Sequence, residues 1–316
     1  MANLNYASDK QLLQIALDAE QEMIEKVEAV EKGWANGLIV SGPPGTGKSH
    51  TVKHMLKSCQ GLMHTSEVYS VQDNDKSSST YKQWFETDRI TGDGPLVRKS
   101  RYAPWSLVRD LWRNRDKENK LIIDDNDIAL MDLNFCGILM SATEQEPVRE
   151  IDYTARKIQE LQCESVPDKF EYNGGVIMLT NYNMKNPPKE GEKGFKKYHE
   201  RWSAMVSRLA GQYVDLQMHN PRVLLAFLEH RVRETEMLLN GGFLVDRYGT
   251  GITEAQQDEL FQVVRETMAQ DALDQALDLR VYNAAAEYII RTDGDSKAWK
   301  AMFNRNLCKR GSNVDA

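Results

Sequence analysis

The chain has 316 residues, of which 41% are hydrophobic and 28% charged, a composition typical of globular domains, and its length predicts one large α/β domain with a smaller second one. No apolar run approaches the about 20 residues of a membrane-spanning helix, and residues 1–10 lack the apolar core of a signal peptide, so we expect a cytoplasmic protein with no membrane partner. A net charge of −7 is unusual for a protein that coats duplex DNA as a monomer, so a nucleic-acid partner would require a local basic patch or a ring of subunits.

The first predicted element is an amphipathic helix over residues 9–32, where apolar side chains recur at helical spacing. Ser8 and Asp9 are both suitable N-caps for it. We expect this N-terminal segment, residues 1–36, to pack on the core of the protein.

The chain next contains the complete P-loop motif G-x-x-x-x-G-K-S, and its residues are Gly42, Pro43, Pro44, Gly45, Thr46, Gly47, Lys48 and Ser49. An apolar run before the motif predicts a strand, and an apolar stripe after it predicts a helix. The backbone N–H groups of such a loop wrap a polyphosphate, helped by the positive end of the helix. Lys48 is expected to reach the β- and γ-phosphates, and the Ser49 hydroxyl to ligate Mg²⁺.

His50 follows the motif directly and is included among the nucleotide-contacting residues. It also lies four residues before His54, which is metal-ligand spacing on a helix, but no third ligand accompanies the pair. The four cysteines are far apart in the sequence, so neither a zinc site nor a disulfide framework is indicated.

A second apolar run, residues 121–123, predicts a buried strand and ends in Asp124 and Asp125. Mg²⁺ bound between phosphates needs a carboxylate anchor, and Asp124 fits that role together with Ser49. Asp125 could orient the attacking water as a base. The alternative is that this acidic cluster merely ends a strand and begins a helix.

A third buried strand is predicted over residues 176–180 and ends at Asn181, and a shorter one over residues 214–216. Ligands bind at the carboxyl ends of strands in open α/β sheets, so the Asn181 amide could hold the attacking water or the γ-phosphate. Its alternative role is to form a turn. Strands interleaved with helices predict a doubly wound parallel sheet, which we assign to residues 37–218.

Beyond Met218 the pattern becomes helical, and helices are predicted over residues 222–240, 253–270, 277–291 and 296–307. Thr253 and Gln256 form a capping box for the second of these. Residues 219–316 are therefore predicted to form an all-helical C-terminal domain.

Together these motifs resemble those of the AAA+ ATPases, and most of all the AAA-family ATPases of bacteriophages, from about Gly37 to Trp299. The P-loop corresponds to Walker A of that family. Residues 121–125 resemble Walker B, with Asp125 where the family usually has the longer Glu. Thr180 and Asn181 resemble sensor 1. The resemblance implies an α/β core with a helical lid, ATP and Mg²⁺ as ligands, and a ring of identical subunits.

The resemblance also implies roles for two arginines. Residues 205–208 are similar to the stretch that carries the arginine finger, so Arg208 would reach the nucleotide of a neighbouring subunit, with Arg201 as the reserve candidate. Residues 277–280 are similar to sensor 2, so Arg280 would touch the γ-phosphate within its own subunit. The alternative for both is a solvated arginine on a helix.

The expected function is Mg²⁺-dependent ATP hydrolysis that remodels DNA or a nucleoprotein complex, in the host cytoplasm if the protein is encoded by a phage. Residues 185–201 form a lysine-rich loop that could contact DNA phosphates, although glutamates dilute its charge. One alternative is a slow nucleotide-gated switch or loader that binds a protein partner, which the shorter Asp125 favours. A small-molecule P-loop kinase is a weaker alternative, because the C-terminal region is all-helical.

Overall fold

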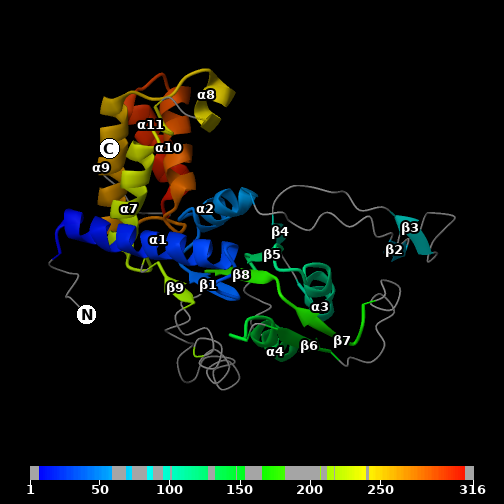
Figure 1. The fold of residues 1–316 in the computed structure, drawn as a ribbon. Coiled ribbons are helices and arrows are strands. Elements are labelled where there is room, and N and C mark those ends of the chain that lie inside the picture. The colour runs from blue at the N-terminus through cyan, green and yellow to red at the C-terminus, as the bar shows by residue number, and fades with distance from the viewer. Residues whose placement is uncertain are drawn as a thin grey trace. The chain divides into compact units, whose positions relative to one another are not determined.

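The computed structural model describes residues 7–58, 69–72, 84–87, 95–99, 102–126, 132–146, 148–153, 166–181, 207, 212–216, 218–239 and 242–309. The described residues form two compact units. One draws on Met1–Glu20, Pro43–Gly47 and Leu216–Ala316, and the other on Gln21–Gly42 and Lys48–Asp215. Figure 1 shows the elements in chain order.

The second unit is built on a five-stranded sheet with the strand order β4-β5-β8-β1-β9. The strands are β1 (Gly37–Ser41), β4 (Leu96–Lys99), β5 (Lys120–Asp124), β8 (Gly175–Thr180) and β9 (Tyr213–Asp215). Every neighbouring pair in this sheet is parallel. The prediction of an α/β protein with a parallel sheet is therefore confirmed.

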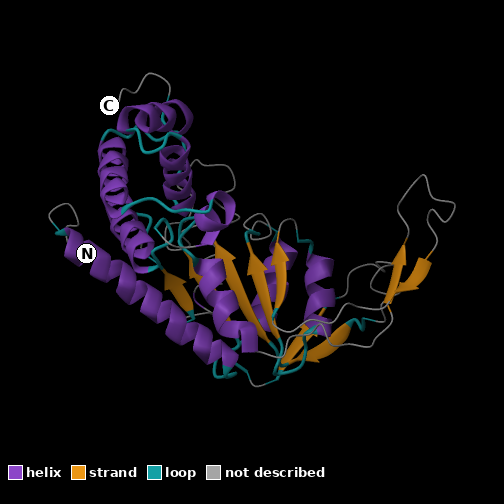
Figure 2. Cartoon of the chain, turned by 90° about the horizontal axis from the view of Figure 1, so that it is seen from above, coloured by secondary structure: helices purple, strands orange, loops and turns teal. Residues whose placement is uncertain are grey.

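The central strands are buried on both faces, which explains their unbroken apolar sequences. On one face, Ile39, Ile123 and Met178 belong to the core that includes α3 (Pro104–Arg113) and α4 (Leu133–Ala142). The alternate side chains point to the opposite face and are at most 1% exposed; they are Leu38, Val40, Ile122, Ile177 and Leu179. Figure 2 shows helices on either side of these strands.

The helix that follows the P-loop, α2 (Lys48–Met55), continues into a 3₁₀ turn, η2 (Leu56–Ser58). Two antiparallel ribbons accompany the main sheet. One pairs β2 (Tyr69–Gln72) with β3 (Trp84–Thr87), and the other pairs β6 (Arg149–Asp152) with β7 (Lys169–Tyr172). The second ribbon alternates buried and exposed residues, as expected of strands with one face toward the core.

The N-terminal helix α1 (Asp9–Glu31) begins where the sequence predicts. The Ser8 hydroxyl oxygen accepts a 3.4 Å hydrogen bond from the Gln11 N–H, and the Ser8 N–H donates to the Gln11 side chain. Of the two candidate N-caps, the structure therefore uses Ser8. The packing of residues 1–36 on the core stays a prediction.

The C-terminal helices are α7 (Pro221–Glu234), α8 (Gly242–Tyr248), α9 (Glu254–Ala269), α10 (Leu279–Arg291) and α11 (Ser296–Leu307). The predicted capping box is confirmed, because Thr253 accepts from the Gln256 N–H and Gln256 accepts from the Thr253 N–H. Aromatic side chains fill the core of this unit: Phe227, Phe261, Tyr282, Trp299 and Phe303 are at most 2% exposed. That residues 219–316 act as a lid stays a prediction.

Two of the four cysteines, Cys136 and Cys308, are buried and take part in no disulfide within the described residues, and the other two lie outside those residues. Among the helices that the structure describes, none has the length and apolarity needed to cross a bilayer.

Candidate functional site

The P-loop, Gly42–Ser49, runs from the end of β1 into the first turn of α2. Gly45 and Gly47 have positive φ angles of 75° and 85°, which glycine adopts without the steric cost of a Cβ atom. Lys48 is 6% exposed, and its Nζ donates a 2.6 Å hydrogen bond to the Gly42 carbonyl oxygen. The loop thus combines the backbone shape and the buried cation that a polyphosphate site requires.

The carboxylate of Asp124 meets the P-loop helix at the carboxyl end of β5. Its Oδ1 accepts a 2.7 Å hydrogen bond from the Ser49 hydroxyl. Its Oδ2 lies 3.2 Å from Lys53 Nζ and 3.4 Å from Lys99 Nζ. The two residues predicted to hold Mg²⁺ are therefore in direct contact, and two lysines to which no sequence motif pointed lie against Asp124.

This environment favours the charged form of Asp124. Burial by itself raises the pKa of the carboxyl, because it penalises the charge. Hydrogen bonds from Ser49 and Lys53, with the positive charges of Lys53 and Lys99, outweigh that effect, and the pKa of Asp124 is lowered overall. The side chain is therefore an anion at neutral pH, as a metal-anchoring carboxylate must be.

The side-chain amide of Asn181 bridges the P-loop lysine and the second acid. Its Oδ1 accepts a 3.2 Å hydrogen bond from Lys48 Nζ, and its Nδ2 donates a 3.3 Å hydrogen bond to Asp125 Oδ1. The register of the sheet explains this arrangement, since Leu179 on β8 is paired with both Val40 on β1 and Asp124 on β5. The strand ends are level, so their following residues converge.

Asp125 has a backbone conformation that is uncommon for its type. Its φ angle is 54°, in the left-handed region where Asn and Asp are enriched over most other residues with a side chain. The side chain is exposed and turns to Asn181. Asp adopts this backbone angle more readily than Glu does, so the backbone here favours the shorter acid.

The donor groups at this site suit a magnesium ion. Ser49 supplies a hydroxyl oxygen and Asp124 a carboxylate, which are hard oxygen ligands. Among the residues open to description, no group of three His, Cys, Asp or Glu side chains forms a cage for a metal ion. Magnesium needs no such cage, because it keeps several waters and binds through one or two protein oxygens plus substrate phosphates.

Arg280 lies in the first turn of α10, beside the aspartate that caps that helix. Asp278 accepts a 2.8 Å hydrogen bond from the Arg280 N–H, and its Oδ2 lies 2.9 Å from Arg280 Nε. The Arg280 side chain is 78% exposed. Asp278 also lies against Gly45 of the P-loop, in the same unit. The structure thus places the predicted sensor arginine two residues from a carboxylate that touches the loop.

The remaining predicted site residues either lie outside the described residues or are exposed. Arg208, Arg201 and the lysine-rich stretch 185–200 lie outside the described residues. His50 is exposed, and its ring stacks on His54 with a centroid distance of 6.2 Å. A metal role for that pair has no support among the side chains that the structure describes.

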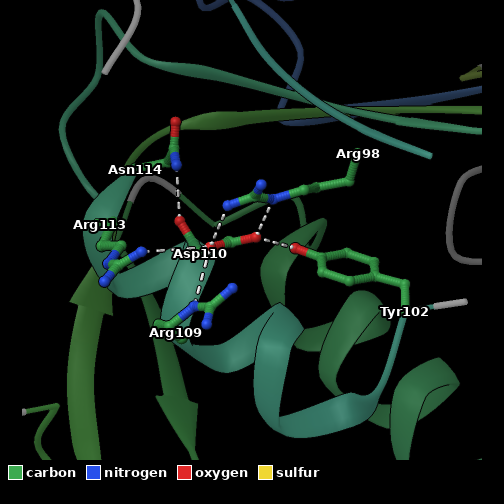
Figure 3. Close-up of polar contacts among 6 residues, drawn as sticks. All are labelled: Arg98, Tyr102, Arg109, Asp110, Arg113 and Asn114. Atoms are coloured by element: carbon green, nitrogen blue, oxygen red, sulfur yellow. Dashed lines mark hydrogen bonds and ion pairs between the residues drawn. The ribbon is translucent and has the colours of Figure 1, made fainter. Parts of the chain in front are cut away.

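A buried ion cluster holds β4 to α3, beside the acid-bearing strand β5 (Figure 3). Its centre is the carboxylate of Asp110, which is 0% exposed. Arg98 donates to both of its oxygens at 2.5 and 3.0 Å, and the Tyr102 hydroxyl donates at 2.8 Å. Arg109 and Arg113 approach within 3.3 and 4.0 Å. Burial and the Asp110 charge raise the pKa of Tyr102 well above its ordinary value, so its hydroxyl stays protonated.

The ion cluster matters for the site because Arg98 immediately precedes Lys99. Neighbouring side chains on a strand point to opposite faces, so Arg98 turns to Asp110 while Lys99 turns to Asp124. Lys99 is paired with Asp124 in the β4–β5 register. Anchoring β4 through Arg98 therefore helps to fix the position of Lys99.

Comparison with known proteins gives a distant similarity. The chain is 24% identical over 210 residues to a protein of Enterobacteria phage T4 described as an uncharacterized 36.7 kDa protein in the nrdC-mobD intergenic region. The match covers 66% of this chain and 54% of the phage protein, so it spans about half of that relative's length. No protein-family model matches the chain.

Proposed function

We propose that the protein is a Mg²⁺-dependent ATPase of the AAA+ type. The observation that carries this proposal is the contact network at the carboxyl ends of three adjacent strands. There Ser49 bonds to Asp124, and Asn181 links Lys48 to Asp125. Lys48, which we propose binds phosphate, and Asp125, which we propose orients water, thus share Asn181 as a hydrogen-bond partner, while the proposed metal ligands Ser49 and Asp124 bond to each other.

In this proposal the chain supplies positioning and charge. Loop N–H groups and the Lys48 ammonium bind the phosphates, and Ser49 and Asp124 would hold Mg²⁺, which when bound neutralises charge on the β- and γ-phosphates. Asp125 accepts a hydrogen bond from the attacking water and orients it. The Asn181 amide, between lysine and acid, senses the γ-phosphate.

The strand order supports this assignment of roles. Because β8 lies between β1 and β5, the residue after β8 lies between the P-loop and the acids. A small-molecule kinase stays the weaker alternative, because Asn181 follows the central strand β8 and the C-terminal region is helical.

The wider parts of the proposal rest on the resemblance to AAA+ ATPases. A ring of identical subunits would let Arg208 act on the neighbouring nucleotide, where an extra cation is worth about 10³–10⁵ in rate. Arg280 would act within its own subunit, and hydrolysis would remodel DNA or a nucleoprotein complex. The similarity to a phage protein supports an origin in a phage and a site of action in the host cytoplasm.

The decisive experiment is Lys48→Ala, assayed for ATP binding and for phosphate release. We expect at least about a hundredfold loss of turnover, as for other deletions of a preorganised transition-state donor. Lys57→Ala removes an exposed lysine from the end of the same helical segment and should retain full activity. A folded Lys48→Ala protein that hydrolyses ATP at the wild-type rate would refute the assignment.

The second candidate function is a slow nucleotide-gated switch or loader. The observation that favours it is Asp125, whose side chain is one methylene shorter than that of Glu and lies on a left-handed backbone. A shorter acid reaches the attacking water less readily, which would slow hydrolysis. Steady-state turnover with and without single-stranded DNA separates the candidates, because a switch would bind ATP tightly and release phosphate slowly in both conditions. Formation of a phosphorylated metabolite would instead indicate a kinase.

A further inference from the structure

The Asp124 carboxylate already binds two cations on the oxygen that is not bonded to Ser49. Its Oδ2 lies 3.2 Å from Lys53 Nζ and 3.4 Å from Lys99 Nζ. We infer that Lys53 and Lys99 compete with Mg²⁺ for Asp124, and so set the metal concentration at which the nucleotide binds. This inference rests on the proposed function, since it requires Asp124 to anchor a metal–nucleotide complex.

The fold places both lysines by regular geometry. Ser49 and Lys53 are four residues apart on α2, so their side chains lie on the same face of the helix, and both reach Asp124. Lys99 is the last residue of β4 and is paired with Asp124 across the sheet. The carboxylate is therefore approached both from a helix and from the neighbouring strand.

Burial explains why the lysines are needed when no metal ion is bound. The Asp124 side chain is 1% exposed, and a buried carboxylate without a partner costs much free energy. The Lys53 and Lys99 side chains are 34% and 55% exposed, so each can withdraw its ammonium group into water. The buried carboxylate therefore needs a cationic partner, whereas either lysine can leave the ion pair and be solvated.

A divalent cation that enters this site meets like charge. Positive groups in close proximity disfavour one another, so either the lysines withdraw or the metal binds more weakly. Removing one lysine charge should therefore lower the Mg²⁺ concentration that nucleotide binding requires. If Lys53 instead bound phosphate directly, its removal would weaken nucleotide binding, so the two roles predict effects of opposite sign.

The test is Lys53→Met, which removes the ammonium group and retains most of the aliphatic stem. Binding of a fluorescent methylanthraniloyl-ATP at fixed concentration would be followed as Mg²⁺ is added to metal-free protein. We expect the Mg²⁺ midpoint of Lys53→Met to fall by about threefold to tenfold relative to wild type, as for removal of one charge from a partly exposed ion pair. Lys99→Met should act in the same direction.

Two variants control for folding and for general charge. Lys53→Arg keeps a cation near Asp124 and should keep the wild-type midpoint, and Lys57→Met removes an exposed lysine that follows α2 and should do the same. An unchanged or raised midpoint in Lys53→Met, with wild type responding to Mg²⁺, would overturn the inference alone. A wild-type protein that takes up no nucleotide at any Mg²⁺ concentration would overturn the proposed function itself.

Discussion

Asp278 and Gly45 lie so close together that a methyl group on the glycine would overlap the Cβ atom of the aspartate. One residue caps a C-terminal helix and the other belongs to the P-loop, and the two are distant in the sequence. The contact places a carboxylate, and through it Arg280, beside the loop that we propose binds phosphate.

Gly45→Ala should destabilise the protein by about 2–4 kcal/mol for two reasons. The new methyl group needs space that Asp278 occupies, and the alanine must adopt a left-handed backbone conformation. Gly249→Ala is the matched control. Its φ of 73° is similar but nothing lies within 4 Å of the added atom, so it should cost only about 1 kcal/mol. Urea unfolding of both variants measures the difference, and equal losses would contradict the close contact.

Asp278→Asn should tighten ATP binding about twofold to tenfold, because it removes a negative charge beside the loop and releases Arg280. Asn is as good an N-cap as Asp, so stability should change by less than about 1 kcal/mol. Asp295→Asn makes the same change at the N-cap of α11 and should leave ATP affinity unaltered. Titration of each variant with Mg²⁺-ATP checks this, and weaker binding by Asp278→Asn would argue against it.

Asp125→Asn should reduce phosphate release at least about a hundredfold while ATP still binds, since Asn cannot accept a proton as a base but tolerates the left-handed backbone. Asp125→Glu should cost about 1 kcal/mol of stability, because Glu adopts that backbone less readily. Asp293, with a φ of 50°, provides the control: Asp293→Glu should cost similar stability and no turnover. Full turnover in Asp125→Asn would remove Asp125 from the mechanism.

Asp110→Asn should destabilise the protein by about 3–5 kcal/mol, because it removes the fully buried carboxylate that pairs with the partly buried guanidinium of Arg98. The control is Asp116→Asn, which changes an exposed aspartate just beyond α3 and should stay within about 0.5 kcal/mol of wild type. Urea unfolding distinguishes them. A small effect of Asp110→Asn would contradict this prediction and would mean that hydration of Arg98 replaces its pairing with Asp110.

The lowered pKa of Asp124 predicts a pH dependence of stability. A carboxyl with a folded-state pKa below its ordinary value of 3.8 stabilises the fold above that pH, and the contribution is lost as the pH falls through the lowered pKa. The stability difference between wild type and Asp124→Asn should therefore be larger at about pH 7 than at about pH 2.5. Unfolding midpoints at both pH values test this, and a difference that grows in acid would have the wrong sign.

Much of the candidate site could be predicted because its signals are local in the sequence. The glycine spacing of the P-loop, the acids after residues 121–123 and Asn181 after another apolar run all identify strand ends. The structure brings Lys48, Ser49, Asp124, Asp125 and Asn181 together as such strand ends require. Lys53 could also have been found, since it lies one helical turn after Ser49.

The remaining contacts had no such signal. Lys99 ends a short strand that no sequence motif marks. It lies beside Asp124 only because β4 and β5 are neighbours in the sheet. The positive φ of Asp125 and the contact between Asp278 and Gly45 likewise depend on long-range packing. Hydrogen bonds within a loop, a helix or a cap join residues close in the chain, so the sequence by itself determined the P-loop, the strand ends and the capping box. Strand order and side-chain pairing join residues far apart, so only the tertiary structure decided which cations surround the acid that we propose anchors the metal.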